Sequence, residues 1–328
     1  MLLQCILFII GFLGVYFGAE WLVKGSSNLS RALGIRPLII GLTVVAFGTS
    51  SPELAVSLTA SIKESSEIAI GNIIGSNIAN IGLVLGITAM IFPLKVERNI
   101  IKNELPLMIA ISVVFYLMAM DKKIGFIDGS FLFTGIILFT GYHIYRTIRS
   151  NSGKSNSRSH NLTSVTDTSG FANKQSLTRR KNLLLNILFI AVGLAGLLIG
   201  AHLLVKGAIF IAGRCGISEM VIGLTVVAFG TSIPEMATSV VSAFRKEAEL
   251  CVGNIIGSNI FNILMVIGSV TLIRPLNVTQ ETLFFELPAM LLFSAVLIPM
   301  MMGTWAINRI KGFVLVLGYC AFVVLLFR

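Results

Sequence analysis

The sequence predicts an all-α polytopic membrane protein of ten transmembrane helices, arranged as two five-helix repeats of inverted topology. Three observations lead to this fold class. Of the 328 residues, 55% are hydrophobic and only 12% are charged, whereas about 25% of the residues of a soluble domain are charged. The hydrophobic residues gather in ten long runs. The second half of the chain repeats the first at an offset of 182 residues.

Most of the apolar runs are near the roughly 20 residues that a membrane-spanning helix needs. The run at 105–120 is shorter, so we expect a tilted helix or a locally thinned bilayer there. The first run lacks a basic amino-terminal region and is longer than a signal peptide, which favours a span over a cleaved signal. The expected spans are 1–23, 37–62, 68–94, 105–120, 124–148, 183–205, 219–244, 250–273, 283–302 and 310–327.

The repeat covers nearly the whole chain outside a central linker. Its clearest copies are GLTVVAFGTSSPE at 41–53 with GLTVVAFGTSIPE at 223–235, and GNIIGSNIAN at 71–80 with GNIIGSNIFN at 253–262. Each half has five spans, an odd number, so the second half must enter the membrane from the opposite face, as in the inverted repeats of secondary transporters. We expect a first repeat at 1–148, a linker at 149–182 and a second repeat at 183–328.

The basic residues are unevenly distributed between the two sides of this topology. The net charge is +10, and 18 of the 25 Lys and Arg residues lie in alternate loops on one side, eight of them at 146–181. The positive-inside rule places that side in the cytoplasm and both termini outside. Basicity is therefore a topology signal, with anionic lipid as a second partner, and we expect no nucleic-acid partner. The linker, rich in Ser, Thr and Asn, is expected to be flexible.

Each copy of the first motif places a glutamate directly after a proline within an apolar run. Proline cannot donate a backbone hydrogen bond, so the carbonyl four residues earlier loses its usual partner. A freed carbonyl in a membrane needs a cavity, a hydroxyl or an ion. Residues three and four positions before the glutamate share its helical face. The oxygen-bearing residues expected together are Thr49, Ser50 and Glu53 in the first half, and Thr231, Ser232 and Glu235 in the second.

A polar stripe at i, i+4 and i+8 follows the neighbouring span of each half. Its members are Asn72, Ser76 and Asn80, and Asn254, Ser258 and Asn262. Such side chains can join helices by hydrogen bonds, but both halves direct the same pattern beside the glutamates. We therefore favour an ion-coordinating or gating role for Ser76, Asn80, Ser258 and Asn262. For Asn77 and Asn259, one residue off the stripe, both roles stay open.

The charge of the two glutamates indicates a cation site. An ionised Glu inside a membrane costs several kcal/mol, and a bound cation removes that cost. Oxygen ligands without nearby Cys, His or Met suit Ca²⁺ or Na⁺, so we predict a site at Glu53 and Glu235. Glu104 and Glu286 also recur, but each precedes a proline, and we interpret them as stabilising a helix start. The four scattered cysteines are interpreted as packing residues.

The two paired motifs resemble the alpha-repeats of the cation/calcium exchanger superfamily, and the microbial sodium/calcium exchanger type in particular. The resemblance covers nearly the whole chain apart from the linker. It implies ten helices, a site between the second, third, seventh and eighth spans, and gating by sliding of the first and sixth spans. It also implies that the carbonyls of Ala46 and Ala228 join the ligands named above. Asn262 departs from the family members that have aspartate there; in potassium-dependent exchangers that acid is associated with potassium use.

These observations predict an antiporter that exchanges Ca²⁺ for Na⁺ by alternating access. A proton-coupled antiporter and a passive cation channel are the alternatives. An intramembrane hydrolase using Ser50 or Ser232 is disfavoured, because the motifs contain no histidine or lysine base. We expect no enzymatic activity and no cofactor, with Ca²⁺ and Na⁺ (or H⁺) as transported ions. The protein is expected to work as a monomer in the plasma (inner) membrane of a microbe.

Overall fold

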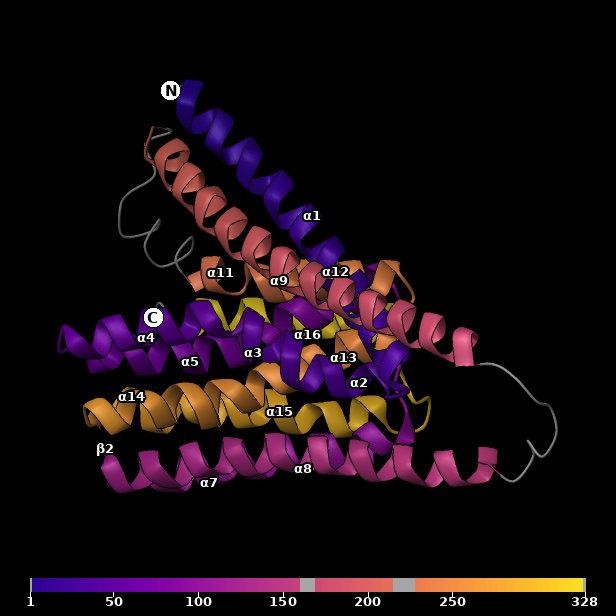
Figure 1. Ribbon diagram of the computed structural model, residues 1–328. Coiled ribbons are helices and arrows are strands. Elements are labelled where there is room, and N and C mark those ends of the chain that lie inside the picture. The colour runs from indigo at the N-terminus through magenta and orange to yellow at the C-terminus, as the bar shows by residue number, and fades with distance from the viewer. Residues whose placement is uncertain (1, 160–168, 215–227, 327–328) are drawn as a thin grey trace.

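The computed structural model describes residues 2–159, 169–214 and 228–326, and these are almost entirely helical (Figure 1). Short π-helical stretches, labelled η, interrupt the spans. There are three of them in the first half and two in the described part of the second. The first half comprises α1 (Leu2–Leu33), α2 (Pro37–Ile40), η1 (Gly41–Val45), α3 (Ala46–Thr49), α4 (Ser51–Ile62), α5 (Ser66–Ala79), η2 (Asn80–Leu85), α6 (Gly86–Ile91), β1 (Leu94–Lys95), η3 (Ile100–Glu104), α7 (Leu105–Ala119), β2 (Lys123–Ile124) and α8 (Phe126–Ser159). The second comprises α9 (Ser169–Arg214), α11 (Ala228–Thr231), α12 (Ile233–Phe244), α13 (Ala248–Phe261), η5 (Asn262–Ile267), α14 (Gly268–Ile273), β3 (Leu276–Asn277), η6 (Thr282–Glu286), α15 (Leu287–Met301), β4 (Ala306–Ile307) and α16 (Arg309–Leu326).

The helical, membrane-spanning character that the sequence predicts is confirmed. Within the described residues, eight helices are long and apolar enough to cross a membrane. The pair Pro37–Thr49 and Ser51–Ile62, bent by 40°, brings the number to nine if it counts as one span. The run expected at 219–244 lies partly outside the described residues, and its described part is α11 and α12.

Two predicted boundaries differ from the structure. The run expected to be short, 105–120, belongs to a full span of 20 residues, Ile100–Ala119, because η3 precedes α7 without a break. The helices on either side of the expected linker are longer than the apolar runs, because α8 continues to Ser159 and α9 begins at Ser169; the flexibility of 149–182 stays a prediction. Helical hydrogen bonds are local to the segment, so a helix can extend beyond an apolar span.

Two spans form the centre of the bundle. The most apolar window of Ala248–Ile273 is 100% buried and that of Ser66–Ile91 is 83% buried, against 22–39% for the other six candidate spans. The last helix of each half packs on the central span of the other half. An added Cβ at Gly312 of α16 would lie 2.6 Å from the Gly86 carbonyl oxygen, and one at Gly268 of α14 would lie 2.9 Å from the Phe133 nitrogen of α8. The halves are therefore interlocked around their two central spans.

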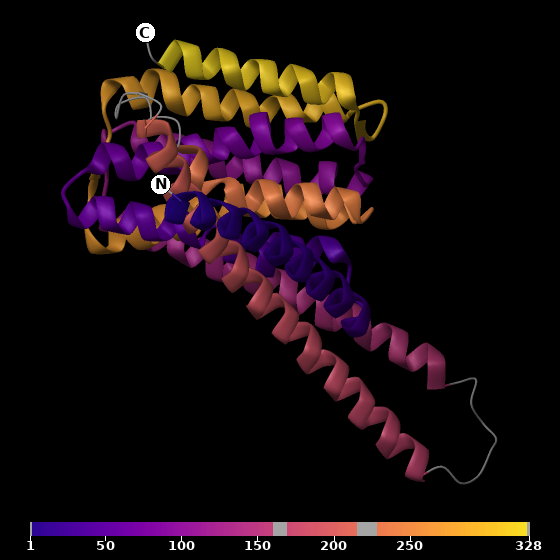
Figure 2. The ribbon, with the colours of Figure 1, turned by 90° about the horizontal axis from the view of Figure 1, so that it is seen from above.

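Helices α1 and α9 form a separate pair against this bundle. Figures 1 and 2 show them side by side, crossing the other helices obliquely. Glycines let their backbones approach closely, since an added Cβ at Gly11 would lie 2.5 Å from the Leu204 nitrogen, and one at Gly200 would lie 2.5 Å from the Val15 nitrogen. Small residues at a helix crossing permit this kind of contact in membranes.

Two short antiparallel strand pairs, which the sequence did not predict, join the halves. Strand β1 pairs with β4 and β2 pairs with β3. Helix α7 runs from the β1 end to the β2 end, while α15 runs from β3 to β4. Equivalent helices of the two halves therefore run in opposite directions.

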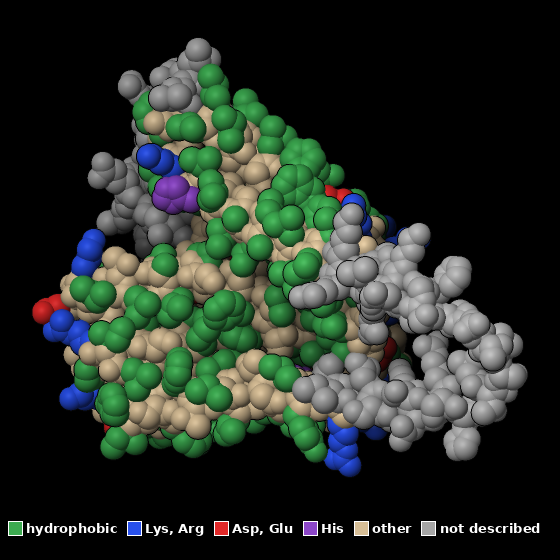
Figure 3. Space-filling model, in the orientation of Figure 1, with side chains coloured by type: hydrophobic (Ala, Val, Ile, Leu, Met, Phe, Trp, Pro, Cys, Tyr) green, Lys and Arg blue, Asp and Glu red, His purple; other side chains and the backbone are tan. Residues whose placement is uncertain are grey.

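The visible outer face is widely covered by hydrophobic side chains, with Lys and Arg toward its edges (Figure 3). Large apolar residues are exposed along the outer helices, for example Ile127 (83% exposed) on α8 and Ile310 (74%) on α16. Exposed apolar surface on this scale suits a lipid environment rather than water.

Candidate cation site

The bent span of the first half, and the described part of its equivalent in the second, break at the serine two residues before the motif proline. Ser50 has φ −81° and ψ 4°, and Ser232 has φ −87° and ψ 1°, so both leave helical geometry at the same position. Pro52 and Pro234 then occupy the first turn of α4 and α12, where a missing N–H has no cost. Each glutamate, Glu53 or Glu235, lies in that same first turn, next to the positive end of the helix dipole.

Both motif glutamates are buried at the centre of the protein. Glu53 is 1% exposed and Glu235 is 0% exposed, and their carboxyl groups are close enough to interact electrostatically. The other predicted side-chain ligands described by the structure are buried as well: Thr49, Ser50, Ser76, Asn80, Thr231, Ser232, Ser258 and Asn262. The two predicted glutamates therefore lie near each other, although they are 182 residues apart in the sequence.

Each carboxyl group lies between hydroxyls of both halves. Ser76 donates to Glu53 Oε1 at 3.4 Å, and the hydroxyl of Thr231, from the other half, lies beside the same carboxyl group. Glu235 has the equivalent neighbours, Ser258 from its own half and Thr49 from the first half. The two glutamates therefore share one polar volume rather than two separate ones.

Thr49 also connects the first bent span to the second central span. Its hydroxyl donates to Asn254 Oδ1 at 3.2 Å and lies 3.2 Å from Ser258 Oγ. In the first half, Asn72 donates to the Glu53 carbonyl at 3.2 Å and to Ser57 Oγ at 2.9 Å. Asn72 and Asn254 thus fix the backbone and hydroxyls around the carboxyl groups.

Four asparagines join the two central spans by a reciprocal pair of hydrogen bonds. Asn80 Nδ2 donates to Asn259 Oδ1 at 3.1 Å, and Asn262 Nδ2 donates to Asn77 Oδ1 at 3.0 Å. Asn77 and Asn259 therefore act as interhelical hydrogen-bonding groups. The bonds use the amide NH₂ of Asn80 and Asn262 and leave the side-chain carbonyl oxygen of each without a partner.

Oxygens without hydrogen-bond partners accumulate at this centre. In an ordinary interior most buried polar atoms are paired, yet here eight predicted ligand atoms are not. They are Ser50 Oγ, Glu53 Oε2, Asn80 Oδ1, Thr231 Oγ1, Ser232 Oγ, both carboxyl oxygens of Glu235, and Asn262 Oδ1. Carboxylate, hydroxyl and amide oxygens are the ligands that hard cations such as Ca²⁺ prefer. Within the described residues, no group of three or more His, Cys, Asp or Glu side chains is placed to hold a metal ion, so the candidate ligands here are two carboxylates with neutral oxygens.

The two predicted backbone ligands stand apart from this set. The Ala46 carbonyl already accepts the Ser50 N–H at 2.9 Å and, more weakly, the Thr49 hydroxyl at 3.4 Å, so an ion would have to displace the weaker of these two donors. Ala228 opens α11, directly after residues 215–227, which are outside the described part of the chain.

π-Helical turns begin at the asparagines of the site. Segment η2 starts at Asn80 and η5 starts at Asn262. A π turn widens the helix locally and occurs often at functional sites. The sequence analysis did not predict these turns, because one extra residue per turn barely changes an apolar pattern.

The other recurring acids lie outside this centre. Glu104 ends η3 within a continuous span, 3.6 Å from His143 Nε2, and Glu286 accepts a hydrogen bond from Thr282 at 3.0 Å. Each directly precedes the α-helical part of its span, α7 or α15, but is itself the last residue of a π-helical segment that continues into it. The span therefore begins before the glutamate, and the interpretation of these acids as helix-start residues is wrong. Glu20 pairs with Arg245 at the end of α12.

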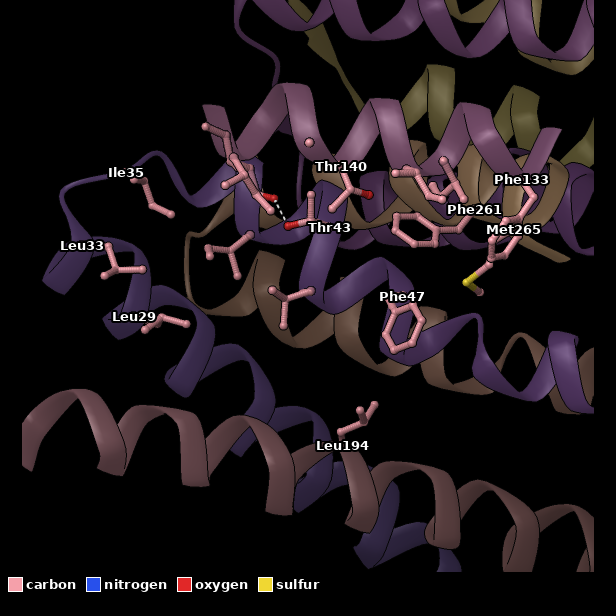
Figure 4. Close-up of a pocket in the computed structure, with 17 residues that line it drawn as sticks. Leu29, Leu33, Ile35, Thr43, Phe47, Phe133, Thr140, Leu194, Phe261 and Met265 are labelled. Atoms are coloured by element: carbon pink, nitrogen blue, oxygen red, sulfur yellow. Dashed lines mark hydrogen bonds between the residues drawn. The ribbon is translucent and has the colours of Figure 1, made fainter. Parts of the chain in front are cut away.

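A large groove nearby has a different character. It has a volume of about 940 Å³ and lies between α1, the bent span, α8 and α13 (Figure 4). Apart from Thr43 and Thr140 its lining side chains are apolar, with Phe47, Phe261 and Met265 among them. Without an acid or an amide in its wall, it is not the cation site.

Apolar helices around a buried, oxygen-rich centre define a polytopic membrane protein of the ion-transporting kind. The sequence matches the family described as "Sodium/calcium exchanger protein" over residues 3–150 and 185–328. It is 36% identical to the putative antiporter CaxA of Alkalimonas amylolytica, over 100% of this chain and 99% of that protein. It is 34% identical to the sodium/calcium exchanger MaX1 of Methanosarcina acetivorans, over 98% of both chains.

A solved structure agrees with these relatives. The sodium-calcium exchanger NCX_Mj superposes with a TM-score of 0.82 at 30% identity, covering 99% of both chains. The chain belongs to the sodium/calcium exchanger family, among the microbial members of the cation/calcium exchanger superfamily. It is thus a member of a family of ion exchangers rather than of enzymes.

Proposed function

We propose that the protein is a secondary active antiporter that exchanges Ca²⁺ for Na⁺ by alternating access, with Glu53 and Glu235 at its central site. The observation that carries the proposal is the shared volume of these two buried carboxyl groups, each flanked by a hydroxyl of the opposite half. A relative named as a sodium/calcium exchanger aligns along 98% of this chain.

The ligands of the proposed site come from both halves in equal measure. They are Glu53, Thr49, Ser50, Ser76 and Asn80 with the Ala46 carbonyl, and Glu235, Thr231, Ser232, Ser258 and Asn262 with the Ala228 carbonyl. Ca²⁺ takes six to eight oxygens, and this set exceeds that number, so several Na⁺ ions or one Ca²⁺ ion can use overlapping parts of it.

Charge neutralisation couples the two fluxes in this proposal. Burying unpaired carboxylates in a low-dielectric interior is costly. The protein therefore changes sides only when cations neutralise Glu53 and Glu235. The pair α1 and α9, which packs through glycines, is the element proposed to slide past the core.

The makeup of the site favours Na⁺ over H⁺ as the counter-ion. A proton needs only a carboxylate, whereas a metal ion also needs neutral oxygens at several positions. The side-chain carbonyls of Asn80 and Asn262 are left without donors by their cross-half bonds, which is the arrangement a metal ion requires.

We further propose ten spans in two inverted repeats. Two observations support this arrangement: α7 and α15 run in opposite directions, and each strand of one half pairs with a strand of the other, β1 with β4 and β2 with β3. The positive-inside rule then places 149–182 in the cytoplasm and both termini outside. The plasma membrane is the proposed location, in line with the 37% identical inner membrane protein YrbG of Escherichia coli, and the working unit is a monomer.

Calcium flux into proteoliposomes tests the proposal. A Na⁺ gradient imposed with pH clamped on both sides is expected to drive Ca²⁺ uptake, and a pH gradient without Na⁺ is expected to drive none. Glu53→Gln should abolish the uptake, while Glu286→Gln, a span glutamate outside the site, should retain it. Uptake driven only by the pH gradient would replace Na⁺ by H⁺, and uptake without any counter-ion gradient would indicate a channel.

A further inference from the structure

Helix α12 carries three further hydroxyls on the face of Glu235. Thr238, Ser239 and Ser242 follow the glutamate at i+3, i+4 and i+7, the spacing of one helical face. All three are 0% exposed. None of their oxygens makes a hydrogen bond of good geometry, although the Cys251 thiol lies beside the Ser239 hydroxyl. They form a row from the central glutamate toward the end of the helix.

Several other buried hydroxyls bond to their own helix, whereas Ser26, Ser61 and Thr88, outside the central site, are without a partner like the row on α12. Serine and threonine in apolar helices commonly donate to the carbonyl four residues earlier. Ser112 does so to Met108 at 2.9 Å, Ser294 to Met290 at 2.9 Å and Thr271 to Ile267 at 2.7 Å. The α12 hydroxyls make no such bond, so the helix does not use them for its own stability.

The row ends at an acidic residue held by α1. The Glu247 N–H donates to the Ser242 carbonyl at 2.8 Å, which places Glu247 directly at the end of the row. Its carboxyl group accepts hydrogen bonds from the Ser27 hydroxyl and from Arg31 Nη2, the latter at 2.6 Å. The Glu247 side chain is 16% exposed and that of Arg31 is 68% exposed, so this cluster separates the row from solvent.

The equivalent helix of the first half lacks the row. At the offset of 182, α4 has Val56, Ser57 and Ala60 in these positions. Its remaining hydroxyl is occupied, since Ser57 accepts from Asn72 at 2.9 Å and donates to the Ala69 carbonyl at 3.3 Å. A row of three hydroxyls at these positions is therefore specific to the second half rather than a consequence of the duplication, although α4 has one unpartnered hydroxyl elsewhere, at Ser61.

We propose that Thr238, Ser239 and Ser242 line the cytoplasmic path of the transported cation between Glu235 and Glu247, and that Ser27 and Arg31 of α1 close it. The inference rests on the proposed function and adds the route by which the ion arrives. Hydroxyl oxygens replace part of the hydration shell of Ca²⁺ or Na⁺ along the row. When α1 slides, Ser27 and Arg31 leave Glu247, whose carboxylate then attracts cations at the mouth.

Sided thiol labelling tests the path. The native cysteines at 5, 215, 251 and 320 are replaced, and Ser242→Cys is made in that background, with Ser294→Cys as the matched control. Na⁺-driven Ca²⁺ exchange of the unlabelled proteins is measured first. If the cysteine-free protein shows no exchange, that result counts against the proposed function and not against the path. A membrane-impermeant cationic methanethiosulfonate added at the cytoplasmic face is expected to block exchange for Ser242→Cys and to leave Ser294→Cys unaffected.

Two further variants test the cytoplasmic mouth of the proposed path, at Glu247. Glu247→Gln is expected to lower the apparent Ca²⁺ affinity from the cytoplasmic side by roughly tenfold, the low end of what a charged cleft contributes to local ion concentration, without changing it from outside. Arg31→Gln is expected to speed labelling at position 242, because the closing contact is lost. Active exchange with no labelling at position 242 would overturn the path, as would equal labelling from both faces. Equal affinity loss on the two sides would overturn the role of Glu247.

Discussion

The packing of α1 against α9 leads to a prediction about Gly18. An added Cβ at Gly18 would lie 2.7 Å from the Leu197 Cα and 2.8 Å from the Gly193 carbonyl oxygen, both backbone atoms that cannot rotate away. At Gly196, on the same interface, the nearest atoms to an added Cβ are the Gly18 Cα at 3.6 Å and the Gly14 carbonyl oxygen at 3.8 Å, which is ordinary van der Waals contact. Gly18→Ala must therefore separate the helices, whereas Gly196→Ala need not.

The two substitutions are expected to change the free energy of unfolding in opposite directions. Opening the interface by about 0.5–1 Å forfeits a quarter to a half of the dispersion energy of each contact, and overpacking of this kind costs about 1–3 kcal/mol. Gly196→Ala should be neutral or stabilising by about 0.5–1 kcal/mol, because alanine is the better helix former. Unfolding of both purified variants by SDS in mixed micelles measures the difference. Equal stabilities would refute the close backbone contact between α1 and α9.

Two other predictions concern the central asparagines and the moving pair. Asn259→Ala leaves the Asn80 amide without its 3.1 Å acceptor, so it should lower the free energy of unfolding by about 1–3 kcal/mol. Ca²⁺ should still raise the thermal stability of the variant. Loss of this Ca²⁺ effect would make Asn259 part of the ion site instead. A disulfide between Gly14→Cys and Gly196→Cys should leave Na⁺-driven Ca²⁺ exchange intact, because α1 and α9 slide together. An added Cβ at Gly14 lies 3.3 Å from the Gly196 carbonyl oxygen and one at Gly196 lies 3.8 Å from the Gly14 carbonyl oxygen, so both side chains have room at this crossing. Exchange that stops on oxidation and returns on reduction would show that the two helices move relative to each other.

Much of the fold follows from the sequence because a membrane leaves few choices. Backbone groups in lipid must be satisfied within the segment, so long apolar runs predict helices. Proline cannot continue the helical hydrogen bonds, so the breaks at Ser50 and Ser232 were predictable as well. The polar stripe at i, i+4 and i+8 likewise indicated which faces of the central spans meet the glutamates.

The remaining features depend on contacts between elements that no local pattern contains. The pairing of Asn77 with Asn262, and of Asn80 with Asn259, requires knowing which helices face each other. The strand pairs, only two residues per strand, are too short to leave a sequence signal. The row on α12 was missed because serine and threonine within a span usually bond to their own helix.

The sharing of one cation by the two glutamates is tested most directly by a double-mutant cycle on Ca²⁺ binding. Calorimetric titration of the purified protein in detergent gives the Kd for the wild type, Glu53→Gln, Glu235→Gln and the double variant. If both carboxyl groups hold the same ion, each single substitution should weaken binding by roughly 10- to 150-fold, the worth of one charge-assisted contact. The double substitution should then depart from the product of the two, because the groups interact. Wild-type affinity in either single variant, or losses that multiply without coupling, would contradict a joint site.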